Sequence, residues 1–424
     1  MTRLTGLWAT CAVTAVMANA AFAETELRMT WYNDGIEGEV MRGILDRFEA
    51  ENPDITVVLD VVPYKAILET LPTQLASGQG PDMARVTDLG GLAQYYLDMT
   101  PHLSDTAYWE ANFGPFLDWK RTADAPEAIS GFMTQLTVTG PYVNKTLYEQ
   151  AGVALPGEGA TWEDFATSAK AVADALDLPI PMAWDRSGHR VSGPAISMGA
   201  GMFDANGNPA LVDDGLKSMA TMLYDWHQDG TMTKELWGSV SGSSYVPAHE
   251  EFLNANTALI MSGSWMIPQF ADKIGDAFDW WAMPAPCGPA ACTGMPGGAA
   301  LVALADTEHP EEVAKVMEFL AQEENMAEFY GKTLFIPGHL GLAEKGVPFN
   351  TDDPRAEHAL STFAGAVPGI SPVAFQLQGY PSNRVMFNAL ISRLGEAIVG
   401  ELTLDQAFER MSTDVEQQLA EQSR

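Results

Sequence analysis

The sequence predicts an α/β protein with two lobes, between which the chain passes more than once. Its 424 residues, of which 46 % are hydrophobic, exceed what a single compact core accommodates. Apolar strands alternate with amphipathic helices in the first part of the chain, which favours a parallel sheet covered on both faces. No linker rich in Pro, Gly or Ser divides the chain, so we expect the two lobes to be interleaved.

The first elements show this alternation clearly. Leu27–Tyr32 has the pattern of a strand, and Glu37–Asn52 has apolar residues at helical spacing on one face. The nearly continuous apolar run Ile55–Val62 predicts a second strand. A helix over Tyr64–Ala76, a Gly/Pro break and a short strand over Met83–Val86 complete the unit.

The remaining elements are spread over the rest of the chain. Thr161 with Asp164 has the spacing of a helix N-cap, and Pro310 suits the first turn of a helix. We expect strands at Gly131–Val143, Ala258–Ser262, Trp280–Met283 and Leu301–Leu304, and helices at 161–176, 216–226, 309–320, 384–398 and 403–421. Because Trp280 and Trp281 are adjacent, one of them should face the core.

The N-terminal segment is typical of a secretory signal peptide. Arg3 supplies a positive start, residues 4–20 are almost free of charge, and Ala21-Phe22-Ala23 matches a cleavage site. A transmembrane anchor is the alternative, but the apolar stretch is short and Asn19 interrupts it. We expect cleavage after Ala23 and export to the periplasm.

The charge of the chain excludes one class of partner. The sequence has 56 acidic and 23 basic residues, a formal net charge of −33, and no run rich in Lys or Arg. Such a surface repels nucleic acid and anionic lipid. We therefore expect no nucleic-acid partner.

The mature chain would keep two cysteines, because Cys11 lies in the signal segment. Cys287 and Cys292 flank Gly-Pro-Ala-Ala, where Gly288 and Pro289 favour a tight turn. Export exposes both thiols to an oxidising compartment, so we predict a local disulfide. A metal or redox pair is disfavoured, since the spacing is not C-x-x-C and no histidine is near.

The motifs of an enzyme are missing from the sequence. It has no G-x-S-x-G, H-E-x-x-H, P-loop or Rossmann glycine motif, and its seven histidines are scattered. Asp204–Asn208 resembles half a calcium loop but lacks the closing glutamate. We expect no catalytic residue, metal or cofactor. The rival hypothesis is a secreted two-lobed glycoside hydrolase or lyase, which would need two carboxylates roughly 5–10 Å apart.

Aromatic residues beside Gly and Ser suggest a binding role instead. Sugar rings stack their C–H faces on aromatic side chains, and their hydroxyls need polar partners. Trp265 in Ser-Gly-Ser-Trp is the strongest candidate, followed by Trp184 and Tyr380. Core packing is the alternative for each of them.

Taken in order, several segments resemble the type 1 extracellular solute-binding proteins of bacterial ABC importers, the group that includes maltodextrin-binding protein. The segments are Ala76–Asp82 (ASGQGPD), Gly140–Gly152 (GPYVNKTLYEQAG), Thr161–Phe165 (TWEDF), Ala258–Trp265 (ALIMSGSW) and Gly297–Leu320 (GGAALV…HPEE…FL). One departure is Val143, which separates the tyrosine from the asparagine of the second motif. The resemblance covers essentially the whole mature chain.

The resemblance implies a two-lobed periplasmic binding protein fold (type II) with a ligand cleft and a hinge. Residues 24–137 and 299–331 would form one lobe, and 138–298 and 332–424 the other. Chain crossings would lie near Thr137–Pro141, Met295–Gly298 and Gly331–Ile336. The implied protein is a monomeric binder, not an enzyme, whose closed form engages a membrane permease.

The resemblance and the sheet geometry together imply further ligand-binding residues. Parallel sheets place ligands at the carboxyl ends of strands, where Asn33, Asp34, Glu37 and Asp88 occur. By matching segments, Thr137, Thr139, Arg186, His189, Arg190, Gly297, Gly298 and Arg384 are added. Each has a plainer alternative: Asp88 as an N-cap, Arg186 as a partner of Asp185, the glycines as a hinge.

The ligand implied is a carbohydrate: a small glycoside, an oligosaccharide or a polyol. The loop after the third strand, Ala84–Asp88, has no aromatic residue, which favours a small ligand. Arg186, Arg190 and Arg384 leave a sulfonated or phosphorylated glycoside as the alternative.

Overall fold

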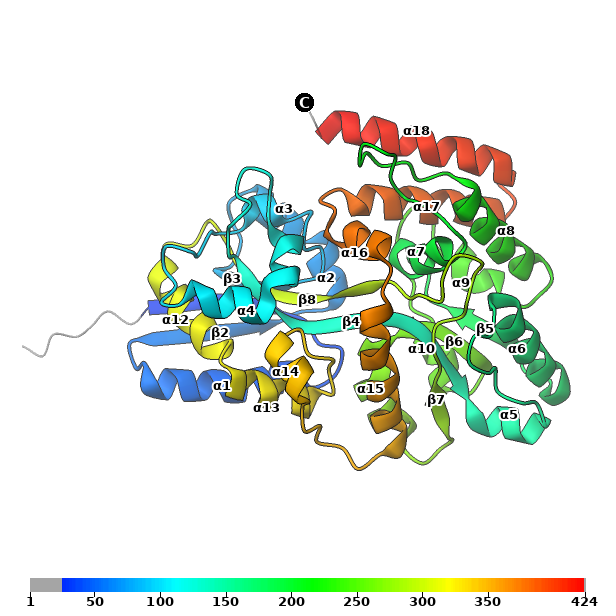
Figure 1. The fold of residues 1–424 in the computed structure, drawn as a ribbon, viewed down its shortest axis with the longest axis horizontal. Coiled ribbons are helices and arrows are strands. Elements are labelled where there is room, and N and C mark those ends of the chain that lie inside the picture. The colour runs from blue at the N-terminus through cyan, green and yellow to red at the C-terminus, as the bar shows by residue number, and fades with distance from the viewer. Residues whose placement is uncertain (1–24, 423–424) are drawn as a thin grey trace, which may run out of the picture.

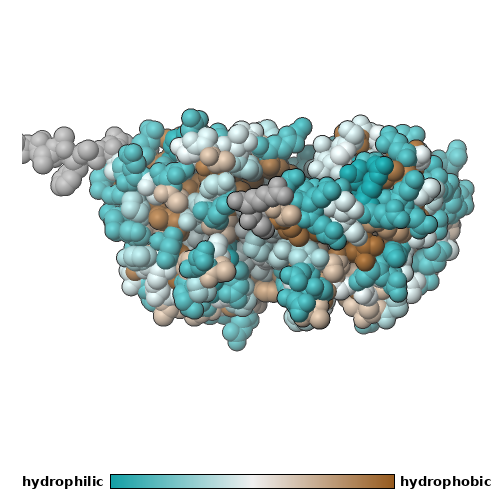
Figure 2. All heavy atoms as spheres, turned by 90° about the horizontal axis from the view of Figure 1, so that it is seen from above, coloured by the Kyte–Doolittle hydropathy of each residue, from teal (hydrophilic) through white to brown (hydrophobic). Residues whose placement is uncertain are grey.

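A computed structural model describes residues 25–422 of the chain. It has two α/β lobes side by side, which strands β4 and β8 join (Figure 1). The predicted signal peptide and its cleavage site lie outside the described residues. On the face shown in Figure 2, hydrophilic residues cover most of both lobes, as the net charge of −33 leads one to expect.

The strands form one path through the molecule. Their bounds are β1 (Thr25–Trp31), β2 (Ile55–Val61), β3 (Met83–Val86), β4 (Gly131–Asn144), β5 (Ile180–Trp184), β6 (Thr257–Gly263), β7 (Trp280–Ala282) and β8 (Pro296–Ala303). Their order is β2-β1-β3-β8-β4-β6-β5, with β7 also paired to β4. β1 is parallel to β2 and β3, as the alternation of strands and helices predicts. β8 is antiparallel to both β3 and β4.

β4 carries the chain from one lobe to the other. Its residues 131–138 pair with β8, whereas residues 139–143 pair with β6, and residues 142–144 pair with β7 on the other side. All 14 of its residues are buried. The stretch Thr137–Thr139 in the middle of β4 therefore lies at the junction of the two lobes, beside the start of β8.

Helices cover both sheets. Around β1–β3 lie α1 (Glu37–Glu51), α2 (Tyr64–Glu69), α3 (Leu71–Ala76), α4 (Thr106–Leu117), α12 (Pro310–Leu320), α13 (Glu323–Thr333) and α14 (Leu340–Lys345). The other lobe has α5 (Lys145–Ala151), α6 (Trp162–Leu176), α7 (Gly188–Ser197), α8 (Asp214–Gln228), α9 (Lys234–Gly238), α10 (His249–Leu253), α11 (Ile267–Ile274), α15 (Pro354–Ala366), α16 (Pro372–Gly379), α17 (Asn383–Ile398) and α18 (Leu404–Gln422). Short 3₁₀ turns occur at 93–95, 118–120, 264–266 and 367–369. Between residues 25 and 422, no single helix is long and apolar enough to span a membrane; only the bent pair Pro354–Gly369 and Pro372–Gly379 meets that test together.

Several expectations about single elements are confirmed and one is wrong. The Thr161 capping box is present at the start of α6, and Trp280 is buried while Trp281 is partly exposed. The helix expected over Tyr64–Ala76 is broken at Thr70, two residues before Pro72, whose ring cannot continue a helix.

The third chain crossing lies later than predicted. α14 packs on α4 and α13, whereas α15 packs on β7 and β4. The passage therefore runs through residues 346–353, not near Gly331–Ile336. The other predicted lobe boundaries stay predictions.

The predicted disulfide is present. Cys287 and Cys292 are bonded, with their Cα atoms 3.9 Å apart. The Cys287 N–H donates to the carbonyl oxygen of Ala160 at 2.9 Å, so the bridged loop is tied to the residue before the α6 cap. Neither cysteine lines the cavity described below.

Candidate functional site

A cavity of about 240 Å³ lies between the lobes. One wall comes from the residues that follow β1 and β3 and from α2; the other comes from α7, α17 and the turn after β6. The carboxyl ends of β1 and β3 thus face the cavity, as expected for parallel strands. Its described lining residues are Tyr32, Asn33, Asp34, Tyr64, Thr87, Gln135, Thr137, His189, Arg190, Tyr245, Pro247, His249, Trp265, Met266, Gln269, Gly297, Gly298, Gln378, Asn383, Arg384 and Phe387.

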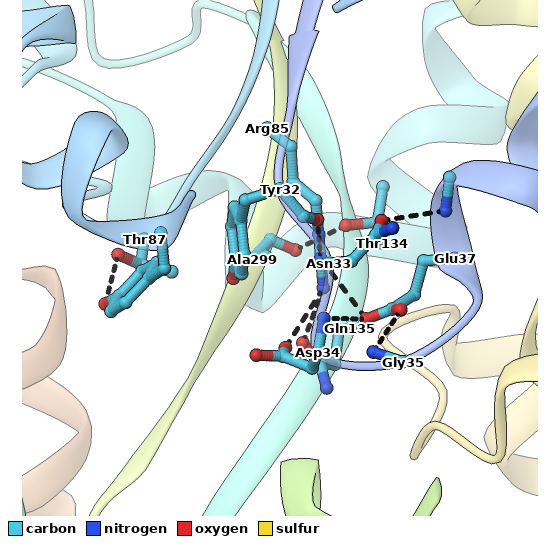
Figure 3. Close-up of polar contacts among 12 residues, drawn as sticks. Tyr32, Asn33, Asp34, Gly35, Glu37, Arg85, Thr87, Thr134, Gln135 and Ala299 are labelled. Carbon is cyan, nitrogen blue, oxygen red and sulfur yellow. Dashed lines mark hydrogen bonds and ion pairs between the residues drawn. The ribbon is translucent and has the colours of Figure 1, made fainter. Parts of the chain in front are cut away.

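Arg85 organises the wall of the first lobe (Figure 3). It points from β3 into the protein and is fully buried. Its Nη1 donates to the carbonyl oxygen of Tyr32 at 2.6 Å, and its Nη2 donates to Gln135 Oε1 at 2.7 Å. The guanidinium also lies 3.5 Å from Glu37 Oε1, 3.6 Å from Asp34 Oδ2 and 4.1 Å from the centre of the Tyr32 ring. One buried cation therefore fixes three cavity residues at once.

Glu37 holds the turn between β1 and α1 instead of facing the cavity. Its carboxylate accepts the N–H groups of Asp34 at 2.7 Å and Gly35 at 2.6 Å, and its side chain is not exposed. The proposed ligand-binding role of Glu37 is therefore replaced by one of shaping the Asn33–Gly35 turn.

Asp34 is the acidic side chain of the cavity. Burial raises the pKa of its carboxyl group from 3.8 to about 7, and the charge of Glu37 adds to this. The positive charges of Arg85 and Arg190 lower the pKa but do not compensate. The side chain still exposes 23 % of its surface, which leaves its oxygens open to a ligand.

The raised pKa of Asp34 predicts how ligand-free stability depends on pH. In the folded protein the group keeps its proton up to about pH 7, whereas in the unfolded chain it loses it near 3.8. Its contribution to stability is thus full below 3.8 and is lost as the pH rises through about 7, at up to about 1.4 kcal/mol per pH unit. Relative to wild type, Asp34→Asn should gain stability between pH 5 and pH 7 in denaturant titrations. If the difference in unfolding free energy between Asp34→Asn and wild type did not change with pH, the raised pKa of Asp34 would be contradicted.

Arg190 dominates the opposite wall. Its guanidinium lies 4.2 Å from the Trp265 ring and 5.4 Å from the Tyr245 ring. Nε is 3.4 Å from Oδ2 of the buried Asp185, and it has no hydrogen-bond partner among residues 25–422. Trp265 is only 9 % exposed, with Arg190 against its ring, and the Arg190 side chain is 14 % exposed.

Several polar atoms around the cavity are buried without a partner. His189 Nε2 lies 2.9 Å from the carbonyl oxygen of Pro296, which only accepts, so Nε2 carries the hydrogen. Burial lowers the pKa of His189 to about 3, so the ring is neutral and Nδ1 is an acceptor. Asn383 donates to two carbonyls of α16, which leaves Oδ1 as an acceptor. His189 Nδ1, Asn383 Oδ1, Gln269 Oε1 and Gln378 Oε1 are all unpaired.

A second hollow of about 640 Å³ adjoins the first and shares Tyr64, Arg190, Tyr245, Pro247, Arg384 and Phe387 with it. Asp88 and Arg186 line this second hollow. Arg384 Nε is 3.8 Å from Asp88 Oδ2, and Arg384 Nη2 donates to Thr87 Oγ1 at 3.4 Å. Burial raises the pKa of Asp88. These long contacts link α17 to the loop after β3, across the cleft.

The predicted binding residues divide into three groups. Those that line the main cavity are Asn33, Asp34, Thr137, His189, Arg190, Trp265, Gly297, Gly298 and Arg384; Asp88 and Arg186 line the adjoining hollow. Glu37, Thr139, Trp184 and Tyr380 line neither. Thr139 Oγ1 accepts the Met295 N–H at 2.7 Å.

The two aromatic residues of the third group pack elsewhere. Trp184 is buried and stacks on Trp162 with ring centres 5.4 Å apart, and Tyr380 meets Phe203 edge-on at 5.2 Å. Core packing, the plainer alternative, therefore describes Trp184. Gly298 has a structural reason to be glycine, because its φ is +141° and a Cβ would lie 2.0 Å from the Gln135 carbonyl oxygen.

Some cavity residues were not predicted. Tyr32, Tyr64, Gln135, Tyr245, Gln269, Gln378 and Asn383 are the main ones. Tyr245 follows Gly-Ser-Ser, and an aromatic residue beside Gly and Ser is the same signal that made Trp265 a candidate. Arg85, which organises the first wall, could have been noticed as the single charged residue in the short apolar strand β3. In the described part of the chain, no group of three or more His, Cys, Asp or Glu side chains is placed to hold a metal.

Comparisons with known proteins agree with this architecture. A family model described as "Bacterial extracellular solute-binding protein" matches residues 32–327. A protein of Brucella abortus (strain 2308), named as a binding protein, is 23 % identical over 389 residues, which cover 87 % of this chain and 90 % of the relative.

Solved structures are similar along nearly their whole length. Maltose-bound MalE3 of T. maritima aligns with a TM-score of 0.74 at 17 % identity, covering 92 % of this chain and 99 % of that one. An ABC substrate-binding protein of Listeria monocytogenes in complex with cycloalternan gives 0.74 at 17 %, with 94 % and 99 % covered. A solute-binding protein of Thermotoga lettingae with α-D-tagatose gives 0.75 at 16 %, with 92 % and 98 % covered. The two-lobed fold is thereby confirmed.

Proposed function

Because this chain belongs to the family of bacterial extracellular solute-binding proteins, we propose that it captures a carbohydrate between its lobes and delivers it to the permease of an ABC importer. The family is extracellular, which places the protein in the periplasm or outside the cell. Cleavage after Ala23, action as a monomer and the absence of catalysis are parts of the same proposal.

The unpaired buried polar atoms carry the proposal. Each buried donor or acceptor without a partner costs about 1–3 kcal/mol, so a ligand that pairs with them is bound favourably. The atoms include acceptors on His189 and Asn383 and the Nε–H donor of Arg190. A hydroxyl group both donates and accepts, and a sugar presents several on one small ring. A polyhydroxylated ligand therefore suits this cavity.

Aromatic and charged groups add to this fit. Tyr32, Tyr64 and Tyr245 line the cavity and can contact the C–H faces of a sugar ring. Asp34 and Arg190 lie on opposite walls and can each bind two neighbouring hydroxyls. A volume of about 240 Å³ is below the ~300–1,000 Å³ of drug-sized ligand sites, which favours one sugar unit here, with room for a second in the adjoining hollow.

The carboxylates argue against a glycoside hydrolase. Such an enzyme needs two carboxyl groups roughly 5–10 Å apart around the bound sugar. Among the described lining residues of the main cavity, Asp34 is the single acid. This supports binding without chemistry.

Charge pairing favours a neutral sugar over an anionic one. Arg85 faces Glu37 and Asp34, Arg190 faces Asp185, and Arg384 faces Asp88. The arginines of the cleft thus already have carboxylate partners. A sulfonated or phosphorylated glycoside remains the second candidate, because Arg190 lines the cavity and its guanidinium could hold an anionic oxygen.

The test is a thermal-shift screen of the mature protein. The panel contains mono-, di- and trisaccharides, polyols, glycosyl-glycerols, sulfonated and phosphorylated sugars, amino acids and peptides. A ligand at 100 times its Kd adds about 2.7 kcal/mol to stability, which a melt detects. We expect a neutral sugar to raise the melting temperature and to be recovered unchanged. A consumed sugar would indicate an enzyme, and no response to any carbohydrate would overturn the proposal.

A further inference from the structure

Residues 239–247, here called the lid, cross the mouth of the cleft. They join α9 to α10 without forming a helix or strand, and most of them are exposed. Gly242 adopts a φ of +64°, which favours glycine. The lid carries Tyr245, which is partly buried and lines both hollows of the cleft.

Arg186 holds the lid with its backbone and its side chain together. Its N–H donates to the Val246 carbonyl at 2.8 Å, and its own carbonyl accepts the Val246 N–H at 3.3 Å. Its Nη1 donates to the carbonyl oxygen of Ser244 and its Nη2 to that of Gly242, each at 2.6 Å. Nη2 also lies 3.4 Å from the carbonyl oxygen of Ile391 in α17. The guanidinium of Arg186 therefore donates its hydrogen bonds to backbone carbonyls of the lid and of α17.

The neighbouring residue secures the end of the lid. Asp185 Oδ1 accepts the N–H of Ala248 at 2.8 Å, and Oδ2 accepts the Ser262 hydroxyl at 3.1 Å. Oδ2 also lies near Arg190. Asp185 and Arg186 follow β5 directly, so a rigid strand end anchors an otherwise exposed loop.

Tyr245 reaches the other lobe from this anchored loop. Its ring is 6.3 Å from that of Tyr64 in α2, edge-on, and 5.4 Å from the guanidinium carbon of Arg190. α2 belongs to the first lobe, whereas the lid belongs to the second. The Tyr64–Tyr245 contact therefore spans the cleft only while the lobes are close together.

We propose that the lid retains the bound carbohydrate, and that Arg186 is a positioning residue that sets its release rate by holding Tyr245 over the cavity. This rests on the proposed carbohydrate-binding function. Removing the Arg186 side chain frees the carbonyls of Gly242 and Ser244, so the lid opens more often. Tyr245 then leaves the cleft, and bound sugar escapes faster although no residue that binds it has changed.

The first test needs no sugar. Hydrogen–deuterium exchange of the ligand-free protein should show residues 239–248 exchanging about tenfold faster in Arg186→Met than in wild type, with β5 still protected. Arg186→Lys keeps the charge but lacks the planar fork whose two terminal nitrogens each bind one carbonyl, and it should act in the same direction if Arg186→Met does not fold. Arg393→Met, which removes an arginine bound to Asp414 and Glu396 on α17 and α18, is the control. Unchanged exchange of the lid would overturn the proposal.

The second test measures release. Stopped-flow dissociation uses maltose, or the sugar with the largest shift in the thermal screen if maltose does not bind. Tyr245→Ala and Arg186→Met should each release it about tenfold faster, and the double variant no faster than Tyr245→Ala alone. Effects that multiply, or normal release from Arg186→Met, would refute the positioning role. If no sugar binds, the function fails, while the exchange result still decides whether Arg186 holds the lid.

Discussion

Arg85→Met should lower the free energy of unfolding by about 3–5 kcal/mol, the largest effect we expect from a single substitution in the cleft. Methionine keeps the apolar stem of the side chain but leaves Glu37 buried without its cation, and it also leaves Gln135 Oε1 and the Tyr32 carbonyl without their donor. The midpoint of urea unfolding, followed by circular dichroism, measures this loss.

A matched control separates burial from charge. Arg28 on β1 pairs with Asp60, but its side chain is 55 % exposed. Exposed ion pairs contribute about 0–1 kcal/mol, so Arg28→Met should change little. If Arg85→Met were as mild as Arg28→Met, the buried arginine would not hold the wall of the cleft. Adding Glu37→Gln to Arg85→Met should recover part of the stability, because it removes the uncompensated charge.

Arg190→Met should weaken carbohydrate binding by about 2–4 kcal/mol, roughly 30- to 1,000-fold in Kd. The reason is that the Arg190 guanidinium lines the cavity, contacts Asp185 only through Nε at 3.4 Å in the described part of the chain, and can donate charged hydrogen bonds to a ligand. Isothermal titration with the sugar identified by the thermal screen measures the change.

Arg384→Met is the comparison for Arg190→Met. Arg384 also lines the cavity, but its side chain is 33 % exposed and its Nε and Nη2 already contact Asp88 and Thr87. We expect a loss of about 1 kcal/mol or less. If both variants lost the same binding free energy, Arg190 would contribute no more to carbohydrate binding than Arg384 does. No loss for Arg190→Met would place the sugar away from this wall.

The first strands and helix ends could be predicted from the sequence, because neighbouring residues determine where such elements form. The apolar runs of β1, β2 and β3 and the cap at Thr161 are each set by neighbouring residues, and they occur at the predicted places. The break at Thr70 within Tyr64–Ala76 was missed although Pro72 signals it. The third crossing was misplaced because the position of α14 depends on packing against α4, which lies far away in sequence.

The candidate site was less predictable, for a similar reason. The end of β1 predicts a position for Asp34 at the cavity, and the residue lies there because its place follows from where β1 stops. Whether an aromatic ring faces the cleft or the core depends on partners distant in sequence, and Trp184 turned out to stack on Trp162. Arg186 shows the same difficulty: its sequence neighbourhood suggested a rim residue, but its partners lie 56 and 58 residues away on the lid.

The sharing of β4 between both sheets has a consequence for how the protein folds. The strand β8, which pairs with β3 and with the first half of β4, is reached only after the chain has passed through residues 145–295. The first sheet thus cannot be completed until a large part of the second lobe has been made. Such long-range pairing slows folding. Pairing of β8 with β3 and β4 is therefore expected to be a late step in the folding of this protein.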